Sequence, residues 1–405
     1  MRSFVMAWRN LWRNRRRTLI TMASVFFGVI LSTIMTSMQE GVYSKMIDNV
    51  VKFYTGYLQV QDPDYWDNKT INNTFVPSDS LFALLGQTEG ITEYVPRMES
   101  FTLISTGDET KGGALIGIDP EGENRVTGLK QWLDKGSYLE EDDNGILLTA
   151  SLAENLEVDI GDTLVLLSQG YHGASAEGLF PLRGVLDFPS PEMNSMGGYV
   201  SLSRARDFFW AEDLATSVVV MLENYDKLEE VTGTLRSELG DDYAIITWVG
   251  MQPQVKQMIE ADRAGALVMK AILYLLIGFG ILGTIIMMLS ERRREMGVMI
   301  SIGMKKYRLI VVMIFETVMI GILGVIAGFL VSIPIISFLV NNPIPIPGEA
   351  GEAYSQFGLE PVIYFSSRLS VFSGQAITVL LITLAVAFYP ALHTIRLKAV
   401  EALQS

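Results

Sequence analysis

The stretch Leu309–Leu339, LIVVMIFETVMIGILGVIAGFLVSIPIISFL, decides the fold of this chain. Glu316 is the one formally charged residue within it. A helix needs about 20 apolar residues to cross about 30 Å of hydrocarbon. Three further stretches reach or nearly reach that length: Leu19–Met38, Ala271–Leu289 and Val371–Leu392. The pattern predicts a membrane protein with four transmembrane helices.

A polar insert of more than two hundred residues separates the first apolar stretch from the second. Within it, residues 40–265 include 38 acidic and 15 basic residues, a local charge of −23. Such an acidic balance argues against nucleic acid as a partner. The rest of the chain sums to +9, and its basic residues lie beside the apolar stretches.

Two short segments are rich in Lys and Arg. Residues 1–18 contain six arginines with no acidic residue before Glu40, and residues 291–308 contain six Lys and Arg residues. Short basic segments of this kind remain in the cytoplasm. With four spans, residues 1–18 and 291–308 can both lie in the cytoplasm only if both termini are cytoplasmic and the insert lies outside. The chain is therefore predicted to be a multi-pass membrane protein.

These features divide the chain into nine predicted segments. In order they are a cytoplasmic amphipathic helix (1–18), the first span (19–38), an extracytoplasmic α+β domain with helical stalks (39–265), the second span (266–290), a cytoplasmic coupling segment (291–308), the third span (309–339), an extracytoplasmic loop (340–370), the fourth span (371–392) and a cytoplasmic tail (393–405).

The first eighteen residues show helical periodicity on two faces. Phe4, Trp8, Leu11 and Trp12 recur at helical spacing, and arginines repeat that spacing on another face. We expect this helix to lie in the cytoplasmic interface, with Trp8 and Trp12 at the depth of the lipid headgroups. A simple topology signal is the alternative interpretation.

The polar insert is predicted to be an α+β domain. Short runs rich in Val, Ile and Leu, such as Ile91–Ser105 and Ile146–Thr149, are bounded by Gly, Asp or Asn and predict strands. Helical patterns lie between them, and Ser78 and Ser203 are predicted to cap two of these helices. Helical stalks at Glu40–Lys52 and Gln254–Lys270 would connect the domain to the first and second spans.

The insert contains no recognisable catalytic constellation. The two histidines, His172 and His393, lie on opposite sides of the predicted membrane and cannot share a metal ion. The acidic run Glu140–Asp143 matches no calcium-loop spacing and is interpreted as a solvated turn. We therefore expect no enzyme activity, no metal and no cofactor on this chain.

The segment Gln169–Phe180, QGYHGASAEGLF, lies between two predicted strands. As a protruding loop it could present Tyr171, Leu179 and Phe180 to a partner protein. The alternative is an ordinary hairpin connection with buried ends.

The segment 290–308, SERRREMGVMISIGMKKYR, predicts a short helix between the second and third spans. Ser290 is expected to cap it, Glu291 to begin it and Gly303 to end it. Met296, Met299 and Ile300 would form an apolar face that docks into a groove on a cytoplasmic partner. A plain basic topology loop is the alternative.

The third span has two unusual features. Glu316 lies near its cytoplasmic end, where pairing with a nearby Arg or Lys would offset the cost of burying a carboxylate. Gly324 and Gly328 form a small-xxx-small pattern, which favours close helix approach and is interpreted as a contact between two protomers.

Several motifs resemble those of the FtsX-like (MacB-type) permeases of ABC transporters, nearest the lipoprotein-releasing permeases. Residues 291–297, ERRREMG, and 302–305, IGMK, resemble the coupling loop of that family. Phe315-Glu316-Thr317 resembles its Glu-bearing segment. Tyr389-Pro390-Ala391 and residues 398–403, KAVEAL, resemble its carboxyl-terminal ending, although Ala399 stands where the family usually has Pro.

The resemblance implies a pair of permeases, as a homodimer or heterodimer, around two copies of an ABC ATPase. The predicted ATPase-coupling residues are Glu291, Arg292, Arg293, Arg294, Glu295, Met296, Gly297, Met299, Ile300, Gly303 and Met304. Because the sequence lacks a Gly-x-x-x-x-Gly-Lys-Ser/Thr motif, ATP and Mg²⁺ are expected on the separate ATPase.

The resemblance also suggests a function. It implies release of lipoproteins or similar lipid-like substrates, with Gln169–Phe180 near the position of a hook for a periplasmic chaperone. The alternatives are a transducer that activates a cell-wall hydrolase and a macrolide-type efflux permease.

Overall fold

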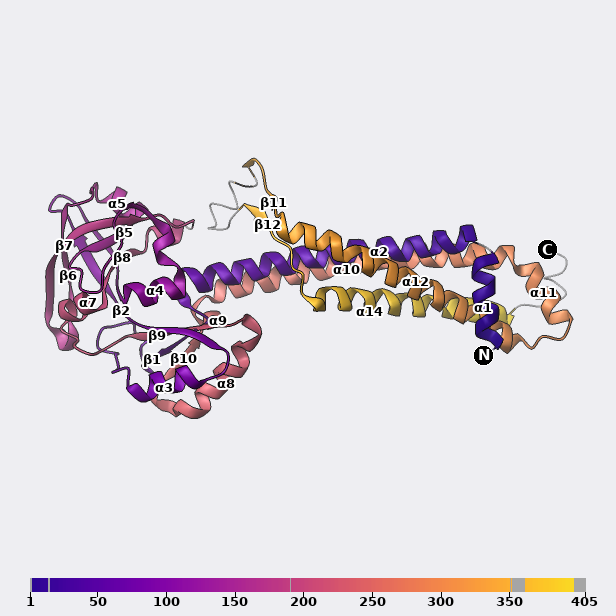
Figure 1. The fold of residues 1–405 in the computed structure, drawn as a ribbon, viewed down its shortest axis with the longest axis horizontal. Helices are drawn as coiled ribbons and strands as arrows, with labels where there is room; N and C mark the ends of the chain where they lie inside the picture. Colours follow the sequence, from indigo (N-terminus) through magenta and orange to yellow (C-terminus); the bar gives the residue numbers. More distant parts are fainter. Residues whose placement is uncertain (1, 14, 190, 350, 352–360, 397–405) are drawn as a thin grey trace. The chain divides into compact units, whose positions relative to one another are not determined.

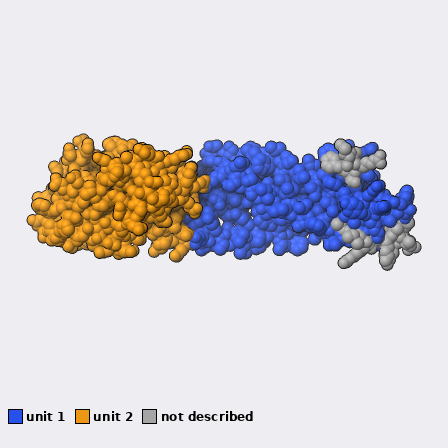
Figure 2. Space-filling model, turned by 90° about the horizontal axis from the view of Figure 1, so that it is seen from below, with its two compact units in different colours: residues 1–44, 258–344, 362–405 blue, residues 45–257, 345–361 orange. Residues whose placement is uncertain are grey.

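The chain forms two compact units in the computed structural model, which describes residues 2–13, 15–189, 191–349, 351 and 361–396. Unit 1, blue in Figure 2, comprises residues 1–44, 258–344 and 362–405. Unit 2, orange in Figure 2, comprises residues 45–257 and 345–361. All four apolar stretches fall in unit 1 and most of the polar insert falls in unit 2.

Helices make up most of unit 1 (Figure 1). Those lying wholly or largely in it are α1 (Arg2–Arg13), α2 (Arg15–Val50), α10 (Pro253–Glu291), α11 (Arg293–Ser301), α12 (Lys306–Asn341), α14 (Leu369–Val386) and α15 (Phe388–Arg396). Within the described residues, four helical segments are long and apolar enough to cross a membrane: Thr18–Val50, Pro253–Glu291, Lys306–Asn341 and Leu369–Pro390. The predicted architecture of four membrane helices is confirmed.

Two glycines in α12 allow it to approach α2 closely. A Cβ atom at Gly324 would lie 2.7 Å from Cβ of Val25, and one at Gly328 would lie 2.8 Å from Cβ of Val29. Real Cβ atoms essentially never come so close to another heavy atom, so both positions require glycine. The prediction that these glycines form a contact between protomers is wrong, because the first span of the same chain already covers them.

Helix α1 packs on α12 through two small or branched side chains. Ala7 and Leu11 are fully or almost fully buried. They join a cluster with three residues of α12: Val312, Met319 and Ile320. Trp8 and Trp12 instead stay exposed on α1, with their ring centroids 6.0 Å apart in an edge-to-face arrangement. The helix therefore has one face for α12 and another that presents two indole rings.

Unit 2 is an α+β domain, as predicted. Its strands within the described residues are β1 (Leu58–Gln61), β2 (Ile91–Ser105), β3 (Thr110–Ile118), β4 (Leu133–Gly136), β5 (Ile146–Thr149), β6 (Thr163–Gln169), β7 (Ser175–Leu186), β8 (Gly197–Ser201), β9 (Ser217–Leu222) and β10 (Ala244–Thr247). Its helices are α3 (Asp79–Gln87), α4 (Pro120–Thr127), α5 (Ala150–Asn155), α6 (Pro191–Asn194), α7 (Leu202–Phe209), α8 (Leu228–Leu239) and α9 (Trp248–Met251). A separate two-stranded sheet contains β11 (Ile344–Pro345) and β12 (Val362–Ile363).

The first part of the sheet has the order β10-β1-β9-β2, with antiparallel neighbours. It is built from two β-α-β units, β1-α3-β2 and β9-α8-β10, which are widely separated in the sequence. Val60 of β1 pairs with Val218 of β9, and both side chains are fully buried. Ser78 caps α3 by accepting a hydrogen bond from the backbone N–H of Leu81, as predicted.

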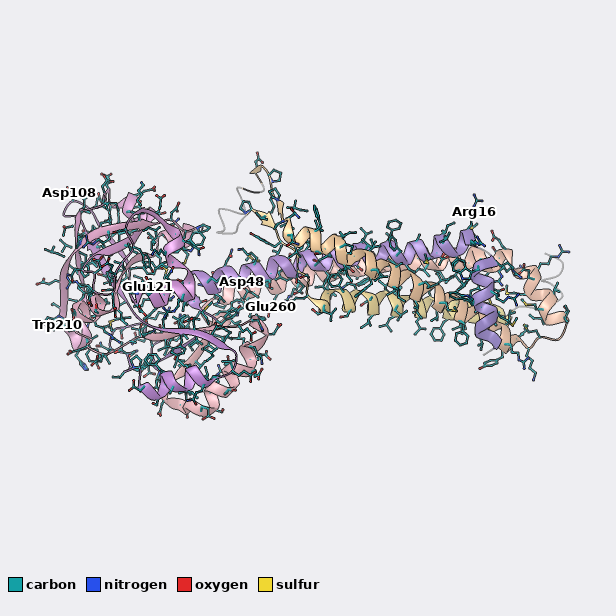
Figure 3. The ribbon with its side chains drawn as sticks, viewed as in Figure 1. Arg16, Asp48, Asp108, Glu121, Trp210 and Glu260 are labelled. Carbon is teal, nitrogen blue, oxygen red and sulfur yellow. The ribbon has the colours of Figure 1, made fainter. Side chains whose placement is uncertain are left out.

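The second part of the sheet continues from β2 through β3, β8, β5, β7 and β4, while β6 pairs with β2 and β7. Its core includes Phe180, Phe208 and Phe209. Ser201, and not the predicted Ser203, caps α7 by accepting from the N–H of Arg204. Trp210 ends this helix with a positive φ of 57° and is 69 % exposed (Figure 3).

Candidate coupling site

The segment between the second and third spans forms a short helix that begins two residues later than predicted. Helix α10 continues through Glu291, Arg292 has a non-helical backbone, and α11 begins at Arg293. Ser290 does not cap α11. Its hydroxyl donates to the carbonyl of Met287 at 2.8 Å, inside α10. The capping prediction failed because the second span does not end at its last apolar residue.

The methionine-rich face of α11 points into unit 1. Met296 is 2 % exposed and belongs to a cluster with Leu289 of α10 and Leu309 and Met313 of α12. Met299, Ile300 and Met304 pack against the same cluster and are partly buried. Met296 is therefore not available for the predicted docking, because it attaches α11 to its own chain, whereas the docking role of the partly buried Met299 and Ile300 stays a prediction.

A different set of side chains faces outward. Val298 is 40 % exposed on α11, and Ile302 is 82 % exposed just after it. Tyr307, at the start of α12, is 74 % exposed. Between them Gly303 has a φ of +101°, a conformation that favours glycine, and nothing lies within 4 Å of its would-be Cβ. The exposed apolar surface thus lies at the α11–α12 turn; we call Val298, Ile302 and Tyr307 the turn surface.

A buried ion pair connects Arg292 to Glu316. Nη1 of Arg292 donates to both carboxylate oxygens of Glu316 at 2.9 Å. Only 8 % of the Arg292 side chain and 2 % of the Glu316 side chain are exposed. The expectation that a basic residue of this segment pairs with Glu316 is confirmed, and the partner is Arg292.

This pair is part of a longer chain of charges. Nε of Arg292 lies 3.5 Å from Oε2 of Glu295 in α11, and Nη2 of Arg13 in α1 lies 2.8 Å from the same oxygen. The Arg13–Glu295 pair is more than half exposed, so it contributes about 0–1 kcal/mol. The buried Arg292–Glu316 pair is the element that fixes the start of α11 to α12.

Of the remaining predicted coupling residues, Glu291, Arg294 and Glu295 are exposed, Arg293 is partly buried and Gly297 is buried. The carboxyl-terminal motif at residues 398–403 lies outside the described residues.

The predicted partner loop at Gln169–Phe180 is part of a β-hairpin. Strand β6 ends at Gln169, a short turn (Tyr171–Gly173) follows, and β7 begins at Ser175. Phe180 is fully buried in the core, and Tyr171 is partly buried against it. Only Leu179, which is 62 % exposed, is available to a partner. The interpretation of all three residues as exposed anchors is wrong, and the hairpin alternative holds.

Sequence analysis did not identify a buried polar network in unit 2. Arg97 on β2 is 2 % exposed and makes two bonds to Glu123 of α4: Nε to Oε2 at 2.8 Å and Nη2 to Oε1 at 2.6 Å. Its Nη1 donates to the carbonyl of Tyr54 at 2.5 Å. Burial alone would lower the pKa of Arg97, but the Glu123 carboxylate outweighs burial and the pKa is raised.

Tyr54 lies in the π-helical turn (Val51–Thr55) that directly follows α2. Its hydroxyl donates to the Glu99 carboxylate, and its ring lies beneath the Arg97 guanidinium, 5.2 Å from ring centroid to Cζ. Burial and the charge of Glu99 raise the pKa of Tyr54. The carboxyl-terminal end of α2 is therefore fixed to β2 and α4 by a network within unit 2.

Comparison with known proteins identifies the family. The model for the MacB-like periplasmic core domain matches residues 18–238, more than half of the chain. The chain belongs to the family of FtsX-like, MacB-type permeases. A second model, for the FtsX-like permease C-terminal region, matches residues 267–399. The chain is accordingly an ABC transporter permease, and its family and four apolar helices make it a multi-pass protein of the bacterial inner membrane.

Individual relatives of this permease are distant. The lipoprotein-releasing system transmembrane protein LolC of Xylella fastidiosa is 22 % identical over 76 % of this chain and 76 % of its own length. The macrolide export ATP-binding/permease protein MacB of Hyphomonas neptunium is 22 % identical over 91 % of this chain and 57 % of its own length. The crystal structure of the periplasmic region of MacB from Actinobacillus actinomycetemcomitans is 20 % identical, covers 53 % of this chain and 98 % of that one, and has a TM-score of 0.36.

Proposed function

We propose that this permease transmits ATP-driven motion from a separate ATPase subunit to unit 2, and that the transported substrate is a lipoprotein. The observation that carries the proposal is α11, which is held to α10 and α12 by its methionine face and by the Arg292–Glu316 pair. A force applied to α11 would be passed to two membrane helices because these contacts are buried.

The turn surface is the proposed contact with the ATPase. Val298, Ile302 and Tyr307 are apolar or aromatic and exposed, and exposed Lys305 flanks them. Exposed apolar side chains grouped at one turn are typical of a protein interface. ATP and Mg²⁺ belong to the ATPase in this proposal. The complex would contain two ATPase copies and a second permease, identical or different.

Helices α2 and α10 are the proposed route toward unit 2. Each covers its apolar span and the predicted stalk in one helix, from Arg15 to Val50 and from Pro253 to Glu291. Side by side in unit 1, they are joined by the Tyr43 hydroxyl, which donates to the Asp262 carboxylate. In this proposal both chain termini lie in the cytoplasm and unit 2 lies in the periplasm.

The lipoprotein assignment is supported by the LolC relative, whose name states that role, and by the surface of α10. One stretch of this helix exposes large apolar side chains: Leu267, Ile272, Leu275, Leu276 and Phe279. An acyl-chain anchor could lie along this stretch at the contact with a second permease. Release to a periplasmic chaperone would follow, with Leu179 as the remaining candidate contact of its hairpin.

Reconstituted vesicles test this function. With the ATPase, ATP and a fluorescent lipoprotein, we expect extraction of the lipoprotein that stops when the ATPase is omitted. Ile302→Asp should abolish it, because a carboxylate would be buried unpaired at the ATPase contact, whereas Ile160→Asp, at a 44 % exposed position in unit 2, should not. Extraction without the ATPase would contradict the proposal. Activation of a cell-wall hydrolase without lipoprotein extraction would favour the transducer alternative. Macrolide export without extraction would favour the efflux-permease alternative.

A further inference from the structure

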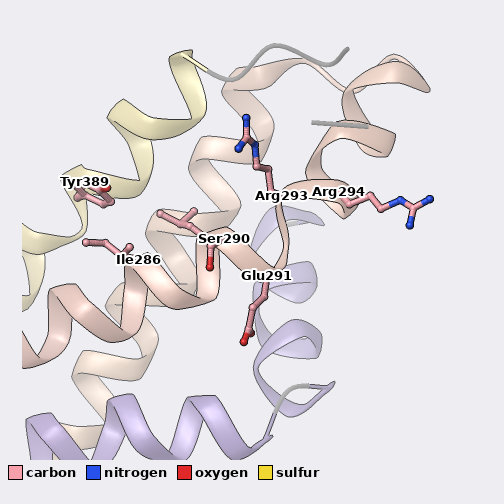
Figure 4. A pocket seen from close by; sticks show the side chains of 7 residues that line it. Ile286, Ser290, Glu291, Arg293, Arg294 and Tyr389 are labelled. Atoms are coloured by element: carbon pink, nitrogen blue, oxygen red, sulfur yellow. The ribbon is translucent and has the colours of Figure 1, made fainter. Parts of the chain in front are cut away.

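A cavity of about 420 Å³ lies where the end of α10, the start of α11 and α15 meet (Figure 4). Its lining has an apolar part and a basic part. Ile286 and Leu289 of α10 and the ring of Tyr389 of α15 form the apolar part, and Arg293 and Arg294 form the basic part. The cavity thus combines two kinds of surface within one membrane-flanking site.

Arg293 has an atom that requires a partner. Its Nε is buried and, among the described residues, has no hydrogen-bond acceptor. Glu291 also lines the cavity, but Figure 4 shows its carboxylate pointing to the opposite side from the Arg293 guanidinium. Glu291 and Tyr389 each have an interaction partner. A buried guanidinium nitrogen without an acceptor among the described residues can take one from a ligand, and an anionic group would supply it.

We propose that this cavity binds the phosphate headgroup of an anionic phospholipid. Arg293 would contact the phosphate, Arg294, whose guanidinium points away from that of Arg293 in Figure 4, would add positive charge at the rim, and an acyl chain would lie along Ile286 and Leu289. Basic pockets between membrane helices on the cytoplasmic side bind such headgroups. The inference rests on the proposed topology, which places this end of the helices in the cytoplasmic leaflet.

Inorganic phosphate carries the same kind of negative charge as a phospholipid headgroup and would be attracted by the same arginines. The apolar lining distinguishes the two sources, because inorganic phosphate gains nothing from Ile286 and Leu289, whereas a lipid buries an acyl chain against them. The position of the cavity beside the last turn of the second span also suits a ligand whose headgroup and chain lie at the membrane boundary.

Native mass spectrometry of the purified full chain tests the proposal. The chain is equilibrated with vesicles of phosphatidylcholine alone or with 30 % phosphatidylglycerol, about one anionic lipid in three, as in a negatively charged leaflet. We expect retained phosphatidylglycerol, and a decrease in its occupancy of about tenfold or more in Arg293→Gln/Arg294→Gln. Arg293→Lys/Arg294→Lys should keep most of the binding, because both positive charges remain.

The matched control is Arg15→Gln/Arg16→Gln, which removes two exposed arginines outside the cavity lining. It should retain phosphatidylglycerol like the unchanged protein. Equal retention in both Gln variants, or displacement of the lipid by millimolar inorganic phosphate, would overturn the proposal. The binding assay contains no ATPase and no lipoprotein. A negative result in it would therefore not contradict the proposed lipoprotein extraction, and a negative extraction result would not contradict the proposed lipid binding.

Discussion

Replacing Arg292 by Ala is expected to abolish ATPase-dependent extraction and to destabilise the helical unit. The substitution leaves Glu316, with 2 % of its side chain exposed, buried without its cationic partner. Removing one member of a buried ion pair costs about 3–5 kcal/mol. The start of α11 also loses its ion-pair connection to α12, so less of the force that we propose the ATPase applies would reach the third span.

The double variant Arg292→Met/Glu316→Gln separates stability from coupling. Replacing both charges removes the uncompensated carboxylate, so thermal unfolding in detergent should recover to near that of the unchanged protein. Extraction should remain low because the ion pair that connects the start of α11 to α12 is absent. Arg13→Ala is the control, since it removes only the exposed outer pair and should change the unfolding free energy by less than about 1 kcal/mol. Full extraction by Arg292→Ala would refute the role of the pair.

Replacing Glu123 by Ala is expected to destabilise unit 2 by about 3–5 kcal/mol, because it leaves the 2 % exposed Arg97 without its carboxylate. Thr127 loses a hydrogen bond as well, since its hydroxyl donates to Glu123 Oε1 at 2.9 Å. Hydrogen exchange should become faster in β2, α4 and the Val51–Thr55 turn that Arg97 connects.

Glu93→Ala is the matched control for Glu123→Ala. It also removes a carboxylate that pairs with an arginine, here Arg125 at 3.3 Å, but both side chains are more than one-third exposed. The expected loss is below about 1 kcal/mol. Similar exchange rates in the two variants would show that the buried network does not hold the end of α2 in place.

Much of the fold could be predicted from sequence because its signals are local. Apolar length alone locates the four spans. Runs rich in Val, Ile and Leu between turn residues give the bounds of β2 and β5 as the structure has them. The Ser78 cap of α3 could be predicted too, because its hydroxyl accepts a hydrogen bond from the backbone N–H of Leu81, only three residues away.

The failed predictions depend on contacts that no local pattern contains. The methionine face of α11 fits either a partner or the chain's own helices, and only the packing of Met296 against Leu309 decides between them. Gly324 favours close helix approach, but the sequence does not say that Val25, about 300 residues away, provides the neighbour. Arg97 and Glu123 form a pair because α4 packs against β2, which neither periodicity nor composition reveals.

Accessibility labelling tests the central claim that the α11–α12 turn and unit 2 work on opposite sides of the membrane. The sequence contains no Cys, so Ile302→Cys and Leu179→Cys each introduce a single exposed thiol. In cells whose outer membrane alone is permeabilised, a membrane-impermeant maleimide should label residue 179 and leave residue 302 unlabelled until the inner membrane is opened. Labelling of both residues in cells with an intact inner membrane would contradict the account.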